Sequence, residues 1–409
     1  MNAEVASSKH RSKPALFEER SASILLVDDE PFNLDLLEQE LAGFELEIRT
    51  AANGRQALEQ VTESPPDMIF LDLMMPELDG FGVLEQLQAN EDWRSIPVVI
   101  VSASSDIANI VRGIEMGAVD FLPKPFEPTI LHARLISGLE RKRLHDLEAK
   151  YLSSLQREME IGRQIQAGFL PDEIPQPDGW TIEAHFQAAR EVAGDFYDVF
   201  KIGKGRLGLM VGDVTDKGVG SAMYMALYRS LLRASLMAEE LAGDVAPEDC
   251  TAPDDCLRDA VKVVNRDICK FHKKAMFATF FIGILDVHEN LLFYVNAGHD
   301  PPYLLRGDSI ERTIKATGPM VGAIEEAVYR VETLVFEPGD SLVMYSDGIP
   351  DARDAQDQMF GRERFREMLV GSHSSPNETF KRVLAAVEAH LEGANQFDDI
   401  TLMMVSRGE

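Results

Sequence analysis

Between residues 23 and 140, five apolar runs alternate with five stretches in which apolar residues recur at helical spacing. The runs are ILLVD, ELEIRTA, DMIFLDL, VVIVSA and AVDFLP, and the helical patterns begin at Pro31, Gly54, Gly80, near Asp106 and at Glu127. A chain that alternates in this way buries its strands in a parallel sheet with helices on both faces. We therefore predict a doubly wound, five-stranded α/β domain, whose functional residues lie at the carboxyl ends of the strands.

Charge limits the functions that are open to this chain of 409 residues. Forty Lys and Arg against 69 Asp and Glu give a formal net charge of −29, which repels nucleic acid and anionic membrane surfaces. No stretch approaches the roughly 18 apolar residues of a membrane span, and the polar N-terminal residues lack the apolar core of a secretory signal. We expect a cytoplasmic protein that binds neither nucleic acid nor membranes.

The segments that flank this α/β domain, residues 23–140, have a different character. Residues 1–22 contain too few apolar side chains to order themselves, which predicts a disordered tail. Residues 141–172 are interpreted as a helical linker, because proline is absent until Pro171 and apolar residues recur at Leu144, Leu147, Tyr151, Leu155 and Met159. This spacing does not specify a left-handed coiled coil. Pairing with a second copy and packing as a single amphipathic helix both remain open.

Residues 173–409 read as a second domain of a different class. Strand patterns arrive in runs after Trp180, with helical patterns grouped at residues 221–237, 257–270 and 378–390. This order predicts an α+β sandwich of mainly antiparallel sheets with helices outside. The acidic segment 238–256 is interpreted as a solvated loop, with a lid as the alternative.

Charged and hydroxyl side chains follow the strands of the first domain. Asp28 and Asp29 follow ILLV, Asp72 follows IFL, and Ser102 and Lys124 end the next two strands. Carboxylates gathered at one sheet edge repel each other unless a hard cation such as Mg²⁺ lies among them. Asp72 can then attack a phosphoryl group to form an aspartyl phosphate, while Lys124 and Ser102 stabilise the phosphate oxygens.

The motifs VDDE, LDLMMPELDG, VSA and FLPKPF resemble those of the receiver domains of two-component response regulators, in the same order and spacing. The resemblance implies a sensor histidine kinase as partner and a bound Mg²⁺. It also implies roles for individual residues: Asp28, Asp29, Asp72 and the Met74 carbonyl bind Mg²⁺, Asp72 accepts the phosphoryl group, Ser102 and Lys124 sense it, and Phe121 is the switch aromatic. Any one of these aspartates alone would read as an ordinary solvated carboxylate at a strand end.

Acidic turns also recur in the second domain. They are AREVAGDFYD with Asp195, MVGDVTDKGVG with Asp213, MYSDGIPDA with Asp347, and QFDDITLMMV with Asp398 and Asp399. Carboxylates without paired His or Cys favour Mg²⁺ or Mn²⁺ over zinc. Two such cations about 3.5–4 Å apart lower the pKa of a bridging water and hold a phosphate ester for in-line attack. The glycines beside these aspartates predict a backbone that turns sharply or approaches a ligand closely.

From about residue 164 to residue 405, these turns and the motifs IQAGFLP, MFATFFIGILD and NAGHDPPYLL resemble the metal-dependent PPM family of Ser/Thr phosphatases. The similarity is to the bacterial branch that acts on anti-sigma-factor antagonists in stress and sporulation signalling. It implies that two Mn²⁺ or Mg²⁺ ions are held by Asp195, Asp213, the Val214 carbonyl, Asp347 and Asp398, with Asp399 beside them. Asp216 departs from the family pattern, either as a solvated loop residue or as an additional ligand. His299 stabilises a turn or acts as a catalytic acid.

Together the two resemblances predict a response regulator in which phosphorylation of Asp72 controls the phosphatase through the linker helix, which also makes a homodimer. The predicted substrate is a phosphoserine or phosphothreonine of a STAS-type anti-sigma-factor antagonist. The alternative is a non-catalytic adaptor, in which phosphorylation gates the binding of a partner to a phosphatase-like fold. Such an adaptor would be expected to have lost metal ligands, and all four aspartates are present.

Overall fold

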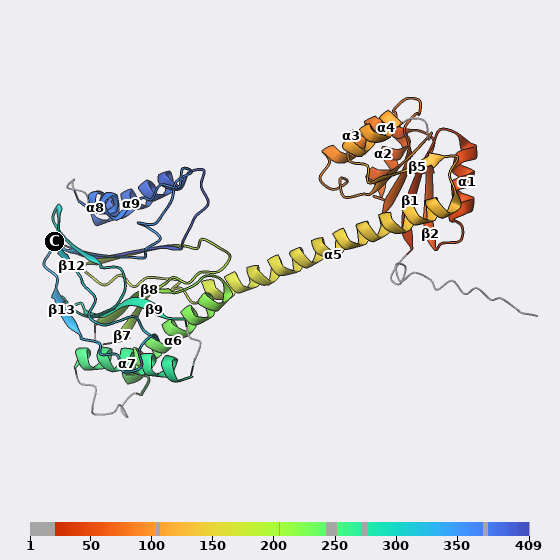
Figure 1. Cartoon of the computed structure of the whole chain (residues 1–409). Coiled ribbons are helices and arrows are strands. Elements are labelled where there is room, and N and C mark those ends of the chain that lie inside the picture. Colours follow the sequence, from red (N-terminus) through yellow and green to blue (C-terminus); the bar gives the residue numbers. More distant parts are fainter. Residues whose placement is uncertain are drawn as a thin grey trace, which may run out of the picture. The chain divides into compact units, whose positions relative to one another are not determined.

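The computed structural model describes residues 21–103, 107–203, 205–242, 252–271, 276–370 and 375–408. The chain divides into two compact units, Met1–Leu155 and Gln156–Glu409 (Figure 1). Residues 1–20 of the predicted tail and residues 243–251 of the acidic segment lie outside the described residues. Each unit is described by itself.

The first unit is a parallel sheet between two helical layers. Its strands, in the order β2-β1-β3-β4-β5, are β1 (Ala22–Val27), β2 (Leu46–Ala51), β3 (Met68–Asp72), β4 (Val98–Ala103) and β5 (Asp120–Lys124). The helices are α1 (Pro31–Leu41), α2 (Gly54–Glu63), α3 (Gly80–Ala89), α4 (Ile107–Glu115) and α5 (Pro128–Ala167). One hydrophobic cluster lies under α2 and α3 and another under α1 and α5. The predicted doubly wound fold is confirmed, and central strand β3 is buried throughout, as parallel strands between helices are.

Helix α5 is continuous for 40 residues, a length of about 60 Å at 1.5 Å per residue. Leu131 and Leu135 on its first turns are fully buried in the first unit. Farther along, Leu144, Leu147 and Tyr151 are 58%, 52% and 65% exposed. Large apolar side chains at this exposure leave an unpartnered stripe along the middle of the helix.

The second unit contains two antiparallel sheets of five strands. One has the order β13-β10-β9-β8-β7 and the other β12-β11-β14-β15-β6. The strands are β6 (Trp180–Gln187), β7 (Phe196–Gly203), β8 (Arg206–Val214), β9 (Ala278–Asp286), β10 (Leu291–Ala297), β11 (Tyr303–Arg306), β12 (Ser309–Thr313), β13 (Glu332–Val335), β14 (Ser341–Tyr345) and β15 (Ile400–Arg407). The helices are α6 (Val219–Ala242), α7 (Pro253–Phe271), α8 (Arg362–Leu369) and α9 (Pro376–Leu391).

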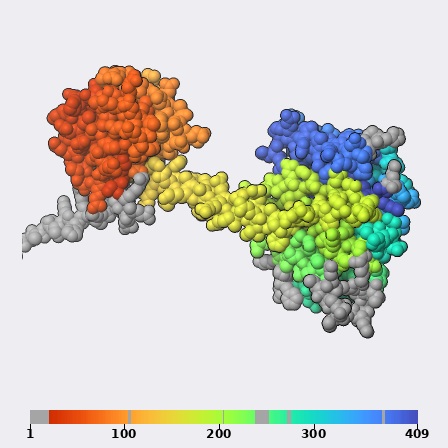
Figure 2. All heavy atoms as spheres, turned by 180° about the vertical axis from the view of Figure 1, so that it is seen from behind, coloured from red at the N-terminus to blue at the C-terminus, as the bar shows by residue number. Residues whose placement is uncertain are grey.

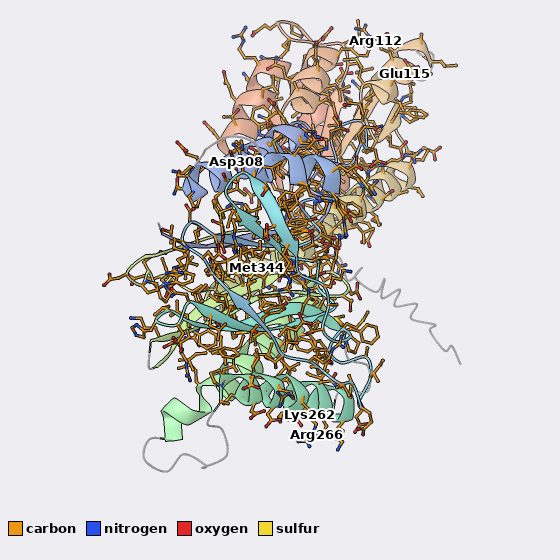
Figure 3. All side chains as sticks on the ribbon, turned by 90° about the vertical axis from the view of Figure 1, so that its left-hand side faces the viewer. Arg112, Glu115, Lys262, Arg266, Asp308 and Met344 are labelled. Atoms are coloured by element: carbon orange, nitrogen blue, oxygen red, sulfur yellow. The ribbon has the colours of Figure 1, made fainter. Side chains whose placement is uncertain are left out.

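These elements form four layers, with a hydrophobic cluster between each layer and the next. The central cluster joins the two sheets and contains Met344, which is fully buried. A second cluster lies between α6 and α7 and their sheet, and a third between α8 and α9 and the other sheet. Figure 3 shows Met344 inside the stack, whereas Lys262 and Arg266 extend outward from α7. The predicted sandwich with outer helices is confirmed, and Figure 2 shows the last helices, in blue, on its outer surface.

Two elements of the second unit leave almost no trace in the sequence. Helix α8 carries the charged run RERFRE and buries only Phe365 and Leu369, too few positions to reveal a period. Strand β12 lies at a sheet edge with nearly every side chain exposed. Neither is predicted above. Within the described ranges, no helix combines the length and apolarity that a bilayer crossing requires.

Candidate active sites

The register of the parallel sheet brings the receiver carboxylates together. Val27 of β1 pairs with Leu71 of β3, so the next residues, Asp28 and Asp72, lie side by side. Carboxylate oxygens of Asp28, Asp29 and Asp72 all lie within 4.8 Å of one another. Asp28 and Asp72 are 1% and 7% exposed, whereas Asp29 is exposed. The group therefore offers three oxygen ligands with access from solvent, which fits Mg²⁺.

Lys124 is the cation of this site. Its Nζ lies 2.7 Å from Asp28 Oδ2 and 3.1 Å from Asp72 Oδ2. Burial raises the pKa of Asp72, and the nearby charge of Asp28 adds to this, while Lys124 opposes both. Burial alone would lower the pKa of Lys124, but the hydrogen bond to Asp28 and the charge of Asp72 outweigh it and raise that pKa. A charged ammonium therefore lies beside the predicted phosphorylation site.

The other predicted receiver residues lie on adjacent elements. Ser102 is buried on β4, where it pairs with Pro123, and Phe121 is partly buried on β5, where it pairs with Ile100. Met74 follows β3, and its main-chain N–H hydrogen-bonds to Asp72. The structure thus places Ser102 and Phe121 on the two strands that follow β3 in the sheet. The signalling roles of these residues stay predictions.

In the second unit, each sheet contributes two of the four predicted ligands. Asp195 immediately precedes β7 and Asp213 lies near the end of β8, and these strands are neighbours in one sheet. Asp347 follows β14 and Asp398 precedes β15, which are neighbours in the other sheet. Residues that are 203 positions apart in the chain, as Asp195 and Asp398 are, thereby reach one site.

The electrostatics of these aspartates show that they lie close to one another. Burial raises the pKa of Asp195 well above its usual range, and the charges of Asp213 and Asp399 raise it further. Burial and the charges of Asp347 and Asp398 raise the pKa of Asp213 to about 7. Burial and the charge of Asp398 raise the pKa of Asp347 to about 6. Negative charge in excess of nearby cations is the condition that bound divalent cations relieve.

The carboxylates of the second unit are less compactly grouped than those of the receiver site. Among the described residues, only the receiver trio brings three potential ligand atoms within 4.8 Å of one another. The four aspartates of the second unit, all among the described residues, therefore form no such compact group of three. All the donors are oxygens, which fits Mg²⁺ or Mn²⁺.

Two glycines permit the close packing at this site. A Cβ at Gly194 would lie 2.3 Å from Ser221 Oγ and 2.8 Å from the Val214 carbonyl oxygen. A Cβ at Gly348 would lie 1.8 Å from the carbonyl oxygen of Asp399. Neither glycine has a positive φ, so the alternative of a turn with positive φ is wrong for these two. Each leaves room for neighbouring protein atoms, and the expected close approach to a ligand stays a prediction.

Asp195 is held by side chains from the β15 end of the site. Thr401 Oγ1 donates a hydrogen bond of 2.6 Å to Asp195 Oδ2. Asp399 accepts hydrogen bonds from the main-chain N–H groups of Ala189 and Gly194, both at 2.8 Å, and of Asp195 at 3.4 Å. Asp399 thus orders the loop that carries Asp195. Sequence reasoning missed Thr401, because a threonine in a strand is ordinary.

Lys217 is a second residue that sequence reasoning missed. Its Nζ lies 3.0 Å from Asp398 Oδ2 and donates to the Phe397 carbonyl at 2.7 Å, and it lies 4.4 Å from the centre of the Phe397 ring. The only signal was its place in GDVTDKGVG, four residues after Asp213. Asp216 is exposed at φ 77°, and its Oδ1 accepts from the Lys217 N–H at 2.8 Å.

His299 is suited to a structural role. It is 4% exposed, its Nδ1 lies 3.0 Å from Thr279 Oγ1, and its main-chain N–H donates to Asn296 Oδ1 at 2.8 Å. Burial lowers the pKa of His299 to about 4. The imidazole is therefore neutral near pH 7, where it is a poor proton donor, and the geometry favours the turn-stabilising alternative.

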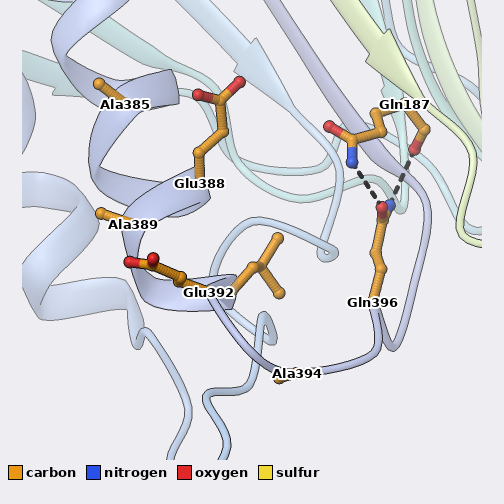
Figure 4. A pocket seen from close by; sticks show the side chains of 8 residues that line it. Gln187, Ala385, Glu388, Ala389, Glu392, Ala394 and Gln396 are labelled. Carbon is orange, nitrogen blue, oxygen red and sulfur yellow. Dashed lines mark hydrogen bonds between the residues drawn. The ribbon is translucent and has the colours of Figure 1, made fainter.

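A surface pocket of about 560 Å³ lies between α9 and the loop that leads to Asp398 (Figure 4). Gln396 Nε2 donates to the carbonyl oxygens of Asp398 at 2.8 Å and Gln187 at 3.0 Å, and Gln187 Nε2 donates to Gln396 Oε1 at 2.8 Å. Glu388 and Glu392 also line the pocket. Their charge disfavours a phosphate ligand, so the two glutamines are best understood as an anchor for the Asp398 loop.

Comparison with known families assigns a match to each unit. The model for the response regulator receiver domain matches residues 24–136. The model for stage II sporulation protein E (SpoIIE) matches residues 203–408, about half of the chain. Most of the residues of each candidate site lie within the matched range, with Asp195 just before the second one.

Individual relatives agree with these matches. Protein IcfG of Synechocystis sp. is 40% identical over 263 residues, 61% of this chain and 41% of IcfG. The probable transcriptional regulator ycf27 of Cyanophora paradoxa is 38% identical over 151 residues, 37% of this chain and 59% of ycf27. The chain thus spans about half the length of these relatives. The SiaA-PP2C domain of Pseudomonas aeruginosa matches with a TM-score of 0.52 at 19% identity, covering 64% of this chain and 100% of that domain, which shows a shared fold.

Proposed function

Because the chain belongs to the stage II sporulation protein E (SpoIIE) family and also carries a response regulator receiver domain, we propose that it is a receiver-controlled, metal-dependent phosphatase of phosphoserine or phosphothreonine proteins. One observation carries the proposal: strand ends of two sheets bring four aspartates together, and burial and then mutual repulsion raise the pKa values of Asp195, Asp213 and Asp347. A fold alone does not need such a concentration of buried and half-buried negative charge, and cation binding gives it a use.

In the phosphatase unit, two Mn²⁺ or Mg²⁺ ions would be held by Asp195, Asp213, the Val214 carbonyl, Asp347 and Asp398. Bound there, such ions lower the pKa of a water and supply positive charge to a phosphate ester, which a chain of net charge −29 otherwise repels. The protein's own groups set the geometry. Thr401 and Asp399 orient Asp195 and its loop, and Lys217 neutralises part of the charge on Asp398.

In the receiver unit, Asp72 is the proposed phosphoryl acceptor. A carboxylate oxygen of Asp72 bonds to phosphorus while the phosphohistidine nitrogen of a sensor kinase leaves. Asp28, Asp29, Asp72 and the Met74 carbonyl would hold Mg²⁺, and the ammonium of Lys124 lies 3.1 Å from Asp72 to stabilise the added charge. Ser102 and Phe121, on the strands after β3, would respond to the phosphate.

Substrate, assembly and location are finer parts of the same proposal. Resemblance to phosphatases of stress and sporulation signalling supports a phosphorylated STAS-type anti-sigma-factor antagonist as substrate, in the cytoplasm. The exposed stripe of Leu144, Leu147 and Tyr151 on α5 supports a homodimer through that helix. Sedimentation with and without beryllofluoride tests this regulated pairing. An unchanged monomer mass together with unchanged turnover would refute it.

The decisive experiment compares Mn²⁺-dependent hydrolysis of a phosphoserine protein by the native chain, Asp347→Asn and Asp72→Asn. We expect Asp347→Asn to abolish turnover, because the site loses a charged ligand, and Asp72→Asn to retain turnover while losing its response to phosphorylation. Equal activity of all three proteins would contradict both site assignments. Binding of the substrate protein without hydrolysis under any metal would instead support an adaptor.

A further inference from the structure

The last turn of α5 is joined to the phosphatase site by one side chain. Gln166 Nε2 donates a hydrogen bond of 2.6 Å to the Ala193 carbonyl oxygen, and the Ala193 N–H donates one of 2.9 Å to Gln166 Oε1. Gln166 is 8% exposed and Ala193 is 1% exposed. The side-chain amide of Gln166 thus hydrogen-bonds to both the N–H and the carbonyl oxygen of Ala193. Both residues are buried, so water does not compete for these bonds.

The loop fixed in this way leads directly into a proposed metal ligand. Asp195 lies two residues after Ala193, and Gly194 between them has no room for a side chain. On its other side, the loop is held by the hydrogen bonds that Asp399 accepts. The position of Asp195 therefore depends on two supports, one from α5 and one from the β15 end of the site.

A second contact comes from the same face of α5. Gly162 lies one turn before Gln166, and a Cβ placed on it would lie 3.5 Å from Val192 Cγ1. Residues four apart on a helix share a face, so this face of α5 hydrogen-bonds to Ala193 through Gln166 and lies beside Val192 at Gly162. Rotation of the helix end by one residue, about 100°, would remove both contacts together.

We propose that Gln166 is a positioning residue for Asp195 and that it couples the state of α5 to the affinity of the phosphatase site for divalent cations. This inference rests on the proposed function and specifies how that function is regulated. The same helix begins at Pro128 and is anchored in the receiver core by Leu131 and Leu135. A change in the last turn of α5 breaks the Gln166 hydrogen bonds, frees the loop, and weakens cation binding by Asp195.

The test uses Gln166→Leu in the full chain, with Gln164→Leu as the matched control. Leucine keeps the size and helix preference of glutamine but has no hydrogen-bonding groups. Gln164 is exposed, and its side chain donates a hydrogen bond to Glu160 of the same helix. We expect Gln166→Leu to weaken Mn²⁺ binding measured by calorimetry about ten-fold, corresponding to about 1.4 kcal/mol. Gln164→Leu should leave it unchanged. Saturating Mn²⁺ should restore the turnover of Gln166→Leu, which a general loss of folding would not permit.

Coupling is tested by beryllofluoride, which mimics the aspartyl phosphate. We expect it to change the Mn²⁺ affinity of the native chain at least about three-fold, and that of Gln166→Leu by much less. Native Mn²⁺ affinity in Gln166→Leu would overturn the positioning role. A full beryllofluoride response in this variant, or none in the native chain, would overturn the coupling.

A second variant keeps the proposal testable if Gln166→Leu misfolds. If Gln166→Leu does not fold, Gln166→Asn decides, since its amide is one methylene shorter and cannot keep both hydrogen bonds of Gln166 to Ala193 in their present geometry. Weakened Mn²⁺ binding is expected there as well, and native affinity would refute the proposal. Failure of the proposed phosphatase function can be told apart from failure of the Gln166 proposal. In the first case Asp347→Asn would remain active or the native chain would bind no Mn²⁺.

Discussion

Asp399 offers the sharpest test of how this site is built. Its carboxylate is 7% exposed and accepts main-chain hydrogen bonds from Ala189 through Oδ1 and from Gly194 and Asp195 through Oδ2. In Asp399→Asn, the amide can keep its oxygen toward Gly194 and Asp195, but its NH₂ then faces the Ala189 N–H and cannot accept a hydrogen bond. At least one buried donor is left without a partner.

The structure sets the size of the effect. A hydrogen bond to a charged acceptor contributes about 1.5–3 kcal/mol, and the remaining bonds weaken when the charge is removed. Loss of that charge also relieves repulsion on Asp195 and Asp213, whose pKa values Asp399 helps to raise, and we take this gain as about 1 kcal/mol. We therefore expect Asp399→Asn to lower the free energy of unfolding by about 2 kcal/mol, or the melting temperature by roughly 4–8 °C.

The assay is urea and thermal unfolding of the full chain in EDTA, so that metal binding does not contribute. Asp216→Asn is the matched control, because Asp216 is exposed, accepts a hydrogen bond from the adjacent Lys217 N–H, and has a φ of 77° that asparagine also adopts. It should change the free energy of unfolding by less than about 0.5 kcal/mol. If Asp399→Asn is as stable as this control, the inferred support of the loop is refuted.

Two other residues give independent predictions. Lys217→Met should tighten Mn²⁺ binding about two- to five-fold in calorimetry, because Asp398 loses a partly exposed ion pair, worth about 0–1 kcal/mol, that competes with the cation. Lys217→Arg keeps the ion pair and should leave the affinity unchanged, and weaker binding by Lys217→Met would contradict the prediction. His299 has a folded-state pKa of about 4, below its usual value of about 6.5, so the unfolded chain binds the proton first and stability is lost as the pH falls from 6.5 toward 4. Between pH 7 and pH 5, the native chain should lose about 2 kcal/mol more than His299→Gln in urea unfolding, and equal losses would show that His299 is not buried in its neutral form.

The sequence predicts the features that depend on repeated patterns. Five apolar runs that alternate with helical patterns specify the parallel sheet. In such a sheet the carboxyl ends of the strands lie at one edge, so Asp28 after β1 and Asp72 at the end of β3 could be expected to lie side by side. In the second unit, glycine-flanked aspartates mark the strand ends that converge, and the antiparallel sandwich is confirmed. Both results follow because burial imposes a period on many residues at once.

Single long-range contacts leave no such pattern. Gln166 lies in a polar stretch of α5 and falls within the motif IQAGFLP, but no pattern of burial in the sequence shows that it is buried while its neighbour Gln164 is exposed. Thr401 and Lys217 likewise gain their importance only from Asp195 and Asp398, which lie about two hundred residues away in the chain. The supports of the site therefore emerge from tertiary structure, whereas its candidate ligands emerge from the sequence.

The hydrophobic clusters of the described residues each fall wholly within one unit. A recombination event in α5 after Leu139 would therefore break no hydrophobic cluster of the described residues, but it could change the angular phase between Leu131 at one end and Gln166 at the other. Since each residue turns the helix by about 100°, an insertion of seven or eleven residues shifts the phase by only about 20°, whereas two residues invert it by about 160°. The length of α5 between the two units, more than its side-chain chemistry, should then decide which receiver domains can be combined with this second unit during evolution.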